Sequence, residues 1–153
     1  MTTDIVHRVG IKAPAAQVYA ALTTLDGLAG WWTEHTTGSP AAGGRLGFRF
    51  RTEAGDEIGG FGMAVRELAP PERVRWSVQE GPAEWIGTDV EFDLSQEGEH
   101  TIVMFGHRRW REAGEFMHHC STKWATFLLS LRDYVETGRG RPAPGDVKIG
   151  DWH

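Results

Sequence analysis

The clearest pattern in the chain is an alternation of apolar and polar side chains. In the stretch 45–51, Leu46, Phe48 and Phe50 alternate with arginines and a glycine. A period of two is typical of a β-strand that buries one face. The same period predicts strands at residues 4–12, 58–68, 74–78, 90–94 and 101–108. The last of these is apolar on both faces from Ile102 to Phe105, so we expect it to be a central strand.

Apolar residues at steps of three and four predict three helices, at residues 14–23, 24–32 and 115–136. Pro14 suits the first turn of the first helix, because that position needs no N–H donor. Gly138 fits a C-terminal cap on the last helix. Residues 33–44 carry no period and predict a loop. Residues 140–153 are rich in Gly and Pro, so we expect an extended tail after a single domain that spans residues 1–139.

The order of these elements predicts an α+β fold. Hairpin-length connections between the strands favour antiparallel pairing. A sheet with one apolar face needs a cover, and the long C-terminal helix is the element that can supply it. We therefore expect a curved antiparallel sheet of about six strands wrapped around that helix. Because one helix cannot fill a wide concave surface, we also expect a cavity between the two.

Composition and charge narrow the possible partners. The 153 residues are 40% hydrophobic and 24% charged, which fits one globular domain. A net charge of −5 argues against nucleic acid or an anionic membrane as a partner. The 7 Trp and 7 Phe exceed the usual need of such a core and indicate an aromatic-lined cavity. One cysteine, no signal-peptide pattern and no apolar run of roughly 20 residues predict a cytoplasmic protein.

Several segments together resemble a known family. They are the strand end at Ala13-Pro14, the Trp31-Trp32 pair, the turn and strand at 68–76, the strand at 101–107 and the helix at 124–136. In their order and spacing they are similar to the heat shock protein 90 ATPase activator homologue-like family, within the START-like or SRPBCC superfamily. The resemblance covers roughly residues 4–139 and implies a helix-grip fold. It leaves function open, because this fold hosts ligand carriers, polyketide cyclases and regulatory modules. Family members often have Gly before the Trp of the last helix, where this chain has Lys123.

The reactive side chains offer few catalytic or metal-binding patterns. His118, His119 and Cys120 are adjacent on a predicted helix, where neighbours point about 100° apart, so they cannot chelate one ion. We expect no metal and no cofactor. Cys120 has no activating partner in the sequence and is expected to be a small buried hydrophobe.

His107 is the candidate for acid–base chemistry. A period of two points it inward with Val103 and Phe105, at the end of its strand near the mouth of the expected cavity. An imidazole there can act as an acid or a base near neutral pH. It can equally cap the strand by bonding to backbone, and both interpretations stay open. Arg109, Trp110 and the stretch 31–35 are expected at the rim of the same opening.

The inward positions predict the ligand-binding residues, most of which belong to the core under any hypothesis. They are Trp32, Phe48, Phe50, Phe61, Met63, Trp76, Phe92, Phe105, His107, Arg109, Trp124 and Leu128. The arginines at 45, 49, 51, 73 and 75 are expected to face solvent and to pair across strands with Asp89, Glu91 and Asp93.

Three functions remain open from the sequence. The first is binding of a small hydrophobic or aromatic molecule in the cavity, by a monomer or a homodimer. The second is a cyclase or dehydratase type of enzyme with His107 as its acid or base. The third is a chaperone-linked interaction module, which the family resemblance alone suggests.

Overall fold

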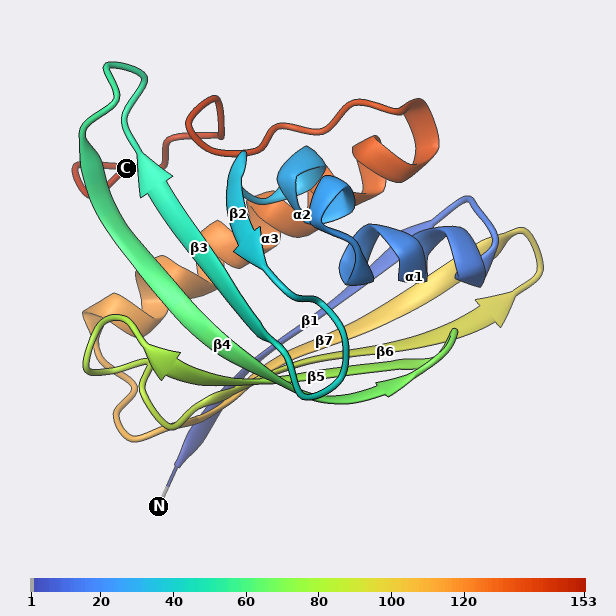
Figure 1. Cartoon of the computed structure of the whole chain (residues 1–153), viewed down its shortest axis with the longest axis horizontal. Helices are drawn as coiled ribbons and strands as arrows, with labels where there is room; N and C mark the ends of the chain where they lie inside the picture. The colour runs from blue at the N-terminus through green and yellow to red at the C-terminus, as the bar shows by residue number, and fades with distance from the viewer. Residues whose placement is uncertain (1) are drawn as a thin grey trace.

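A computed structural model describes residues 2–153 and shows an antiparallel sheet curled around a long helix (Figure 1). Along the chain the elements are β1 (Thr3–Ile11), α1 (Ala15–Thr23), α2 (Leu25–Trp31), β2 (His35–Gly38), β3 (Arg45–Arg51), β4 (Glu57–Ala69), β5 (Arg73–Glu80), β6 (Asp89–Glu97), β7 (His100–Trp110) and α3 (Glu115–Thr137). The predicted α+β helix-grip fold is confirmed.

Within residues 2–153 the seven strands form one sheet in the order β1-β7-β6-β5-β4-β3-β2. Every neighbouring pair is antiparallel. Helix α3 lies across the concave side, and α1 and α2 lie beside it on the same side (Figure 1). No helix of the described residues is both long and apolar enough to cross a membrane.

Strand β2 corrects the loop that the sequence predicts over residues 33–44. It pairs with β3, with His35 opposite Arg49 and Gly38 opposite Leu46. Its residues HTTG contain no apolar alternation, so hydrophobic pattern cannot reveal it. The strand forms because the edge of β3 offers unpaired backbone groups that an extended segment can satisfy.

Strand β7 differs from its predicted central place. It is second in the sheet, between β1 and β6. Its inward residues Val103 and Phe105 are buried, whereas Met104 on the outer face is 50% exposed. The strand is therefore buried on one face at this point. The run of apolar residues in the sequence wrongly predicts burial on both faces.

The ends of the helices follow local chemistry. Pro14 is the N-cap of α1, and the Thr24 side chain at the start of α2 accepts a hydrogen bond from the Gly27 N–H at 3.0 Å. Helix α3 ends at the predicted cap. There Gly138 takes a left-handed conformation with φ of 85°, and its N–H donates to the Tyr134 carbonyl.

Aromatic rings fill the space between the sheet and α3. Their hub is Trp32, which follows α2 directly. Its ring centroid lies 4.3 Å from that of Phe48, 6.2 Å from Trp76 and 4.9 Å from Trp124. Trp76 and Phe92 then extend the packing across the sheet at 5.3 Å. The middle of the concave face is therefore solid.

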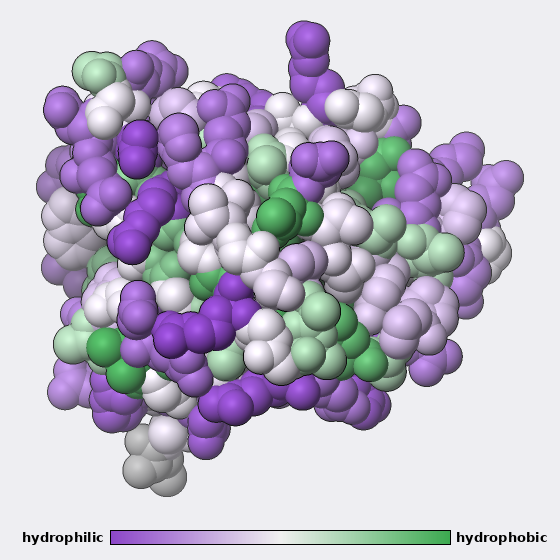
Figure 2. All heavy atoms as spheres, viewed as in Figure 1, coloured by the Kyte–Doolittle hydropathy of each residue, from purple (hydrophilic) through white to green (hydrophobic). Residues whose placement is uncertain are grey.

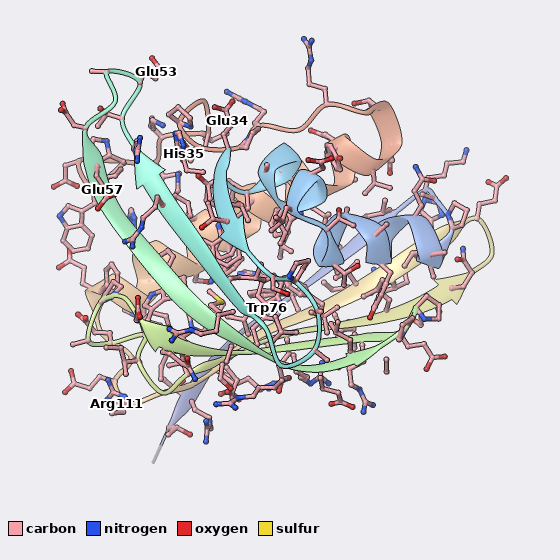
Figure 3. The ribbon with its side chains drawn as sticks, viewed as in Figure 1. Glu34, His35, Glu53, Glu57, Trp76 and Arg111 are labelled. Atoms are coloured by element: carbon pink, nitrogen blue, oxygen red, sulfur yellow. The ribbon has the colours of Figure 1, made fainter. Side chains whose placement is uncertain are left out.

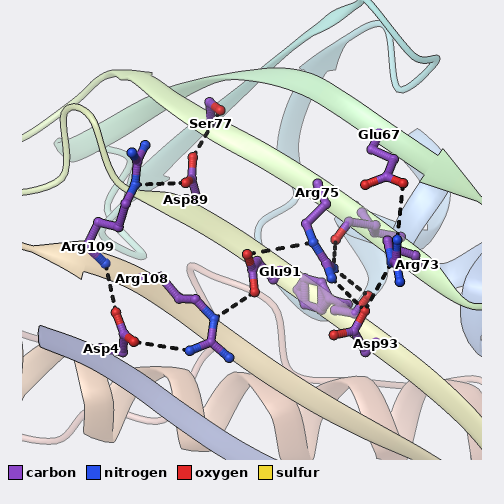
Figure 4. Close-up of polar contacts among 12 residues, drawn as sticks. Asp4, Glu67, Arg73, Arg75, Ser77, Asp89, Glu91, Asp93, Arg108 and Arg109 are labelled. Carbon is purple, nitrogen blue, oxygen red and sulfur yellow. Dashed lines mark hydrogen bonds and ion pairs between the residues drawn. The ribbon is translucent and has the colours of Figure 1, made fainter.

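The convex face carries a network of charged pairs (Figure 4). Arg75 lies 2.8 Å from Asp93 and 3.6 Å from Glu91, and Arg73 lies 3.7 Å from Asp93. The predicted cross-strand pairing is confirmed for these two arginines, whereas Arg45 pairs with Glu80. Figure 2 shows hydrophilic residues over much of one face, with hydrophobic ones in small groups between them.

We predict that Phe92→Ala lowers the free energy of unfolding by about 3–5 kcal/mol. The Phe92 ring is fully buried among Trp31, Trp76 and Phe105, so its removal leaves a cavity that the rigid neighbours cannot close. Urea denaturation measures the change. Ser95→Ala at an exposed position of the same strand is the control and should stay within about 0.5 kcal/mol. A loss below about 1 kcal/mol for Phe92→Ala would mean that the core is loosely packed.

Candidate ligand-binding cleft

A cleft of about 240 Å³ opens at one end of the concave face. It is lined by the first half of α3, the hairpin end of β3 and β4, the β5–β6 connection, and residues 140–153, here called the C-terminal segment. Eight Trp and Phe side chains dominate the lining: Trp32, Phe50, Phe61, Trp85, Phe116, Trp124, Phe127 and Trp152.

The aromatic rings form an ordered stack at the base of the cleft. Phe61 and Trp85 are stacked at 3.9 Å with an interplanar angle of 10°. Trp85 and Trp124 continue the stack at 6.0 Å and 20°. Rings held in parallel planes offer flat faces against which a further planar ring can lie.

Four of the predicted ligand-binding residues line the cleft: Trp32, Phe50, Phe61 and Trp124. Others are sealed in the solid core, namely Phe48, Met63, Trp76, Phe92, Phe105 and Leu128. The opening therefore lies at the end of the concave face and not along it. The reason is Trp32, whose ring fills the space between the sheet and α3 in the middle of that face. Figure 3 labels Trp76 near the centre of the molecule, away from the end of the β3–β4 hairpin where Glu53 lies.

His107 points inward as its period predicts, but it is fully buried and does not reach the cleft. The Trp124 indole N–H donates to its Nδ1 at 3.1 Å. Its Nε2 lies 2.8 Å from the Thr88 hydroxyl, which itself donates to the Trp85 carbonyl at 2.6 Å. Only the neutral tautomer with a proton on Nε2 satisfies all three bonds. Burial lowers the pKa of His107 to about 3, so this ring is a neutral structural connector.

The expected rim residues also lie elsewhere. Arg109 is exposed, and its backbone N–H donates to Asp4 at 2.9 Å while its guanidinium pairs with Asp89 at 3.0 Å. Trp110 is buried in the core. Of the stretch 31–35, Trp32 alone lines the cleft. Arg109 has a positive φ of 73°, which breaks the alternation that sequence reasoning assumes along β7.

The C-terminal segment forms a wall of the cleft that the sequence does not predict. Ala143 is bonded in both directions to the stretch after α2, because its N–H donates to the Trp32 carbonyl and its carbonyl accepts from Glu34. Further along, Asp146, Lys148 and Trp152 line the opening. Trp152 was a possible signal, since a large aromatic residue is unusual in a Gly- and Pro-rich tail.

Lys123, a residue of α3, binds the C-terminal segment through hydrogen bonds. Its ammonium group donates to the Asp146 carboxylate and to the Val147 carbonyl, the latter at 2.7 Å. Lys148 also donates to Asp146, at 2.7 Å. Burial alone would raise the pKa of Asp146, but the bonds from the two lysines outweigh it and lower that pKa. Asp146 is therefore ionised at neutral pH.

The remaining reactive groups are inert or scattered. Cys120 is buried at the base of the cleft, as expected, and burial raises its pKa to about 12. A thiol with that pKa is not a nucleophile at neutral pH. Burial and the nearby charge of Lys123 lower the pKa of His119. Among residues 2–153, no three His, Cys, Asp or Glu side chains gather as metal ligands.

Comparison with models of protein families shows the family of this chain. The family described as Activator of Hsp90 ATPase homolog 1-like protein matches residues 12–136. The chain belongs to this family. The match begins directly after β1, contains the other six strands and all of α3 except Thr137, and stops before the C-terminal segment. None of the curated proteins matches the chain.

Solved structures place this family member among known folds. The Aha1 dimer from Colwellia psychrerythraea is 42% identical, covers 90% of this chain and 99% of its own, and superposes with a TM-score of 0.78. CalU16 from Micromonospora echinospora is 21% identical, with 94% and 70% covered and a TM-score of 0.68. SSP2350 from Staphylococcus saprophyticus is 14% identical, with 92% and 98% covered and a TM-score of 0.71. The last two show the fold alone.

We predict that acidification destabilises the protein through His107. Its folded-state pKa of about 3 lies below the ordinary 6.5, so the unfolded chain takes up the proton first as the pH falls. The stability is complete above pH 6.5 and is lost progressively toward pH 3. Between pH 7 and pH 5 this linkage removes about 2 kcal/mol, which urea denaturation at the two pH values measures.

His107→Gln is the matched variant for this measurement, because the amide keeps a donor for Thr88 but does not titrate in this range. It should be less stable at pH 7 and should lose much less than the wild type between pH 7 and pH 5. Equal losses in both proteins would show that His107 is not the responsible group.

Proposed function

We propose that this protein binds a small aromatic molecule of one or two rings in the cleft. The observation that carries the proposal is the parallel stack of Phe61, Trp85 and Trp124 facing an open space. Binding sites for small molecules are typically concave, mostly apolar and equipped with a few polar groups. The cleft has this character, because its lining is mostly aromatic and its charged side chains are four in number: Arg51, Lys123, Asp146 and Lys148.

The size of the cleft limits the ligand. Its volume of about 240 Å³ lies below the range of about 300–1,000 Å³ that holds drug-sized ligands. An apolar cavity of about 150 Å³ is enough for benzene. A molecule of one or two fused rings matches the space, whereas a long polyketide chain or a lipid would extend into solvent.

The two alternative functions gain less support. A cyclase or dehydratase needs an acid or base beside the bound molecule, and His107 is sealed behind Trp85 and Trp124 with both nitrogens bonded. A chaperone-linked role rests on the description of the family and on the name of the Colwellia relative. Pull-down with a chaperone of the Hsp90 class tests that role directly.

We predict that Gly59→Phe reduces the affinity for 2-naphthamide, a neutral two-ring probe, at least ten-fold. Gly59 lines the cleft, and a Cβ built on it meets no atom within 4 Å, so the new ring can occupy the cleft without disturbing the fold. Isothermal titration calorimetry measures the affinity, and native mass spectrometry of freshly purified protein reveals any co-purified molecule.

Gly114→Phe is the matched control. A Cβ on Gly114 is also unobstructed, the residue does not line the cleft, and its φ of −89° suits any side chain. This variant should bind 2-naphthamide like the wild type. If Gly59→Phe also binds normally while remaining folded, the probe does not occupy this cleft and the proposal fails.

A further inference from the structure

The charges around the cleft are opposite in sign to the charge of the whole chain. The chain has a net charge of −5. The cleft is nevertheless lined by three cationic side chains, Arg51, Lys123 and Lys148, and by one carboxylate, that of Asp146. His119 has a lowered pKa and adds no positive charge at neutral pH. The potential inside the cleft therefore favours an anion.

The two lysines and the arginine differ in what they already bind. Lys123 and Lys148 both pair with Asp146, so their charges are partly neutralised by the C-terminal segment itself. The Arg51 side chain forms no hydrogen bond and no ion pair with any residue in the described range 2–153, and its Nε is buried without a partner. A partly buried cationic group without a partner is costly to the folded state. Its guanidinium is thus the group most ready to accept a ligand.

A β-bulge lies beside Arg51 and not beside the other arginines of its strand. The register between β3 and β4 runs from Phe50 opposite Gly59 to Arg51 opposite Glu57, so Ile58 is an extra residue. The extra residue belongs to β4, and a bulge bends its strand and increases the local twist of the pair. Arg49, one step before the bulge, is exposed and does not line the cleft, whereas Arg51 does.

The acidic residues nearest in the hairpin do not neutralise Arg51. Glu57 is its register partner across the strands, and Glu53 lies in the turn; Figure 3 labels both at the outer end of the hairpin. Both residues are exposed, and neither carboxylate comes within ion-pair distance of the Arg51 guanidinium. The Arg51 guanidinium is therefore available to a ligand in the cleft.

We propose that the ligand is an aromatic carboxylate whose acid group binds the Arg51 guanidinium while its rings lie against the aromatic stack. This inference rests on the proposed function and adds the chemical class of the ligand. A guanidinium presents parallel N–H donors that match the two oxygens of a carboxylate. Lys123 on α3 and Lys148 in the C-terminal segment add long-range attraction, and the aromatic rings favour a planar molecule.

The test compares 2-naphthoate with its neutral isostere 2-naphthamide by isothermal titration calorimetry at low salt. The wild type should bind the carboxylate at least ten-fold more tightly than the amide. Arg51→Met removes the charge and keeps an unbranched apolar side chain, so it should bind both probes with similar affinity. Arg49→Met, on the same strand but outside the cleft, should keep the full preference. Circular dichroism checks folding, and Arg51→Gln replaces Arg51→Met if the latter does not fold.

The outcomes separate this inference from the proposed function. Equal affinity of the wild type for both probes would overturn the carboxylate assignment and leave an apolar site. A preference for 2-naphthoate that persists in Arg51→Met and Arg51→Gln would overturn the role of Arg51. If neither probe binds at millimolar concentration, both the inference and the proposed function fail.

Discussion

The position of one indole ring decides where this molecule is solid and where it is open. Trp32 lies between the sheet and α3 and contacts both, through Phe48 on one side and Trp124 on the other. It fills the middle of the concave surface, and the cleft lies where β3 and β4 extend past it. The carbonyl of the same residue accepts a bond from Ala143, and through that bond it also positions the closing wall of the cleft.

The fold follows from the sequence as far as side-chain period reflects burial. Inward positions such as Leu46, Phe48 and Val103 are apolar because the core requires it, and their spacing locates the strands. Strand β2 is a different case. It is held by backbone bonds to β3, and its threonines would be equally at home in a loop. Backbone pairing at a sheet edge leaves no mark on the sequence, so pattern analysis cannot find it.

The site is harder to predict than the fold, because whether a side chain lines the cleft depends on its position along the strand as well as on the face of the sheet from which it points. Phe48 and Phe50 share a strand and a face, yet Phe48 is sealed in the core and Phe50 lines the cleft. His107 has the direction that its period predicts, but Thr88 and Trp124 enclose it from distant parts of the chain. The contact between Lys123 and Asp146 is also long-range and follows no period. Such features become visible only when the chain is folded.

The β-bulge at Ile58 lets the end of the β3–β4 hairpin change without a change at the core positions of these strands. In a regular strand, moving one side chain to the other face moves every following side chain as well. Here the extra residue is Ile58, the second residue of β4, which lies beside the end of β3. The core positions Leu46 and Phe48 lie further along the pair and keep their places. A change in the length of this one hairpin can thus alter the polarity of the cleft wall while the framework stays intact. Two chains with the same architecture can therefore differ in chemical character at this end of the fold.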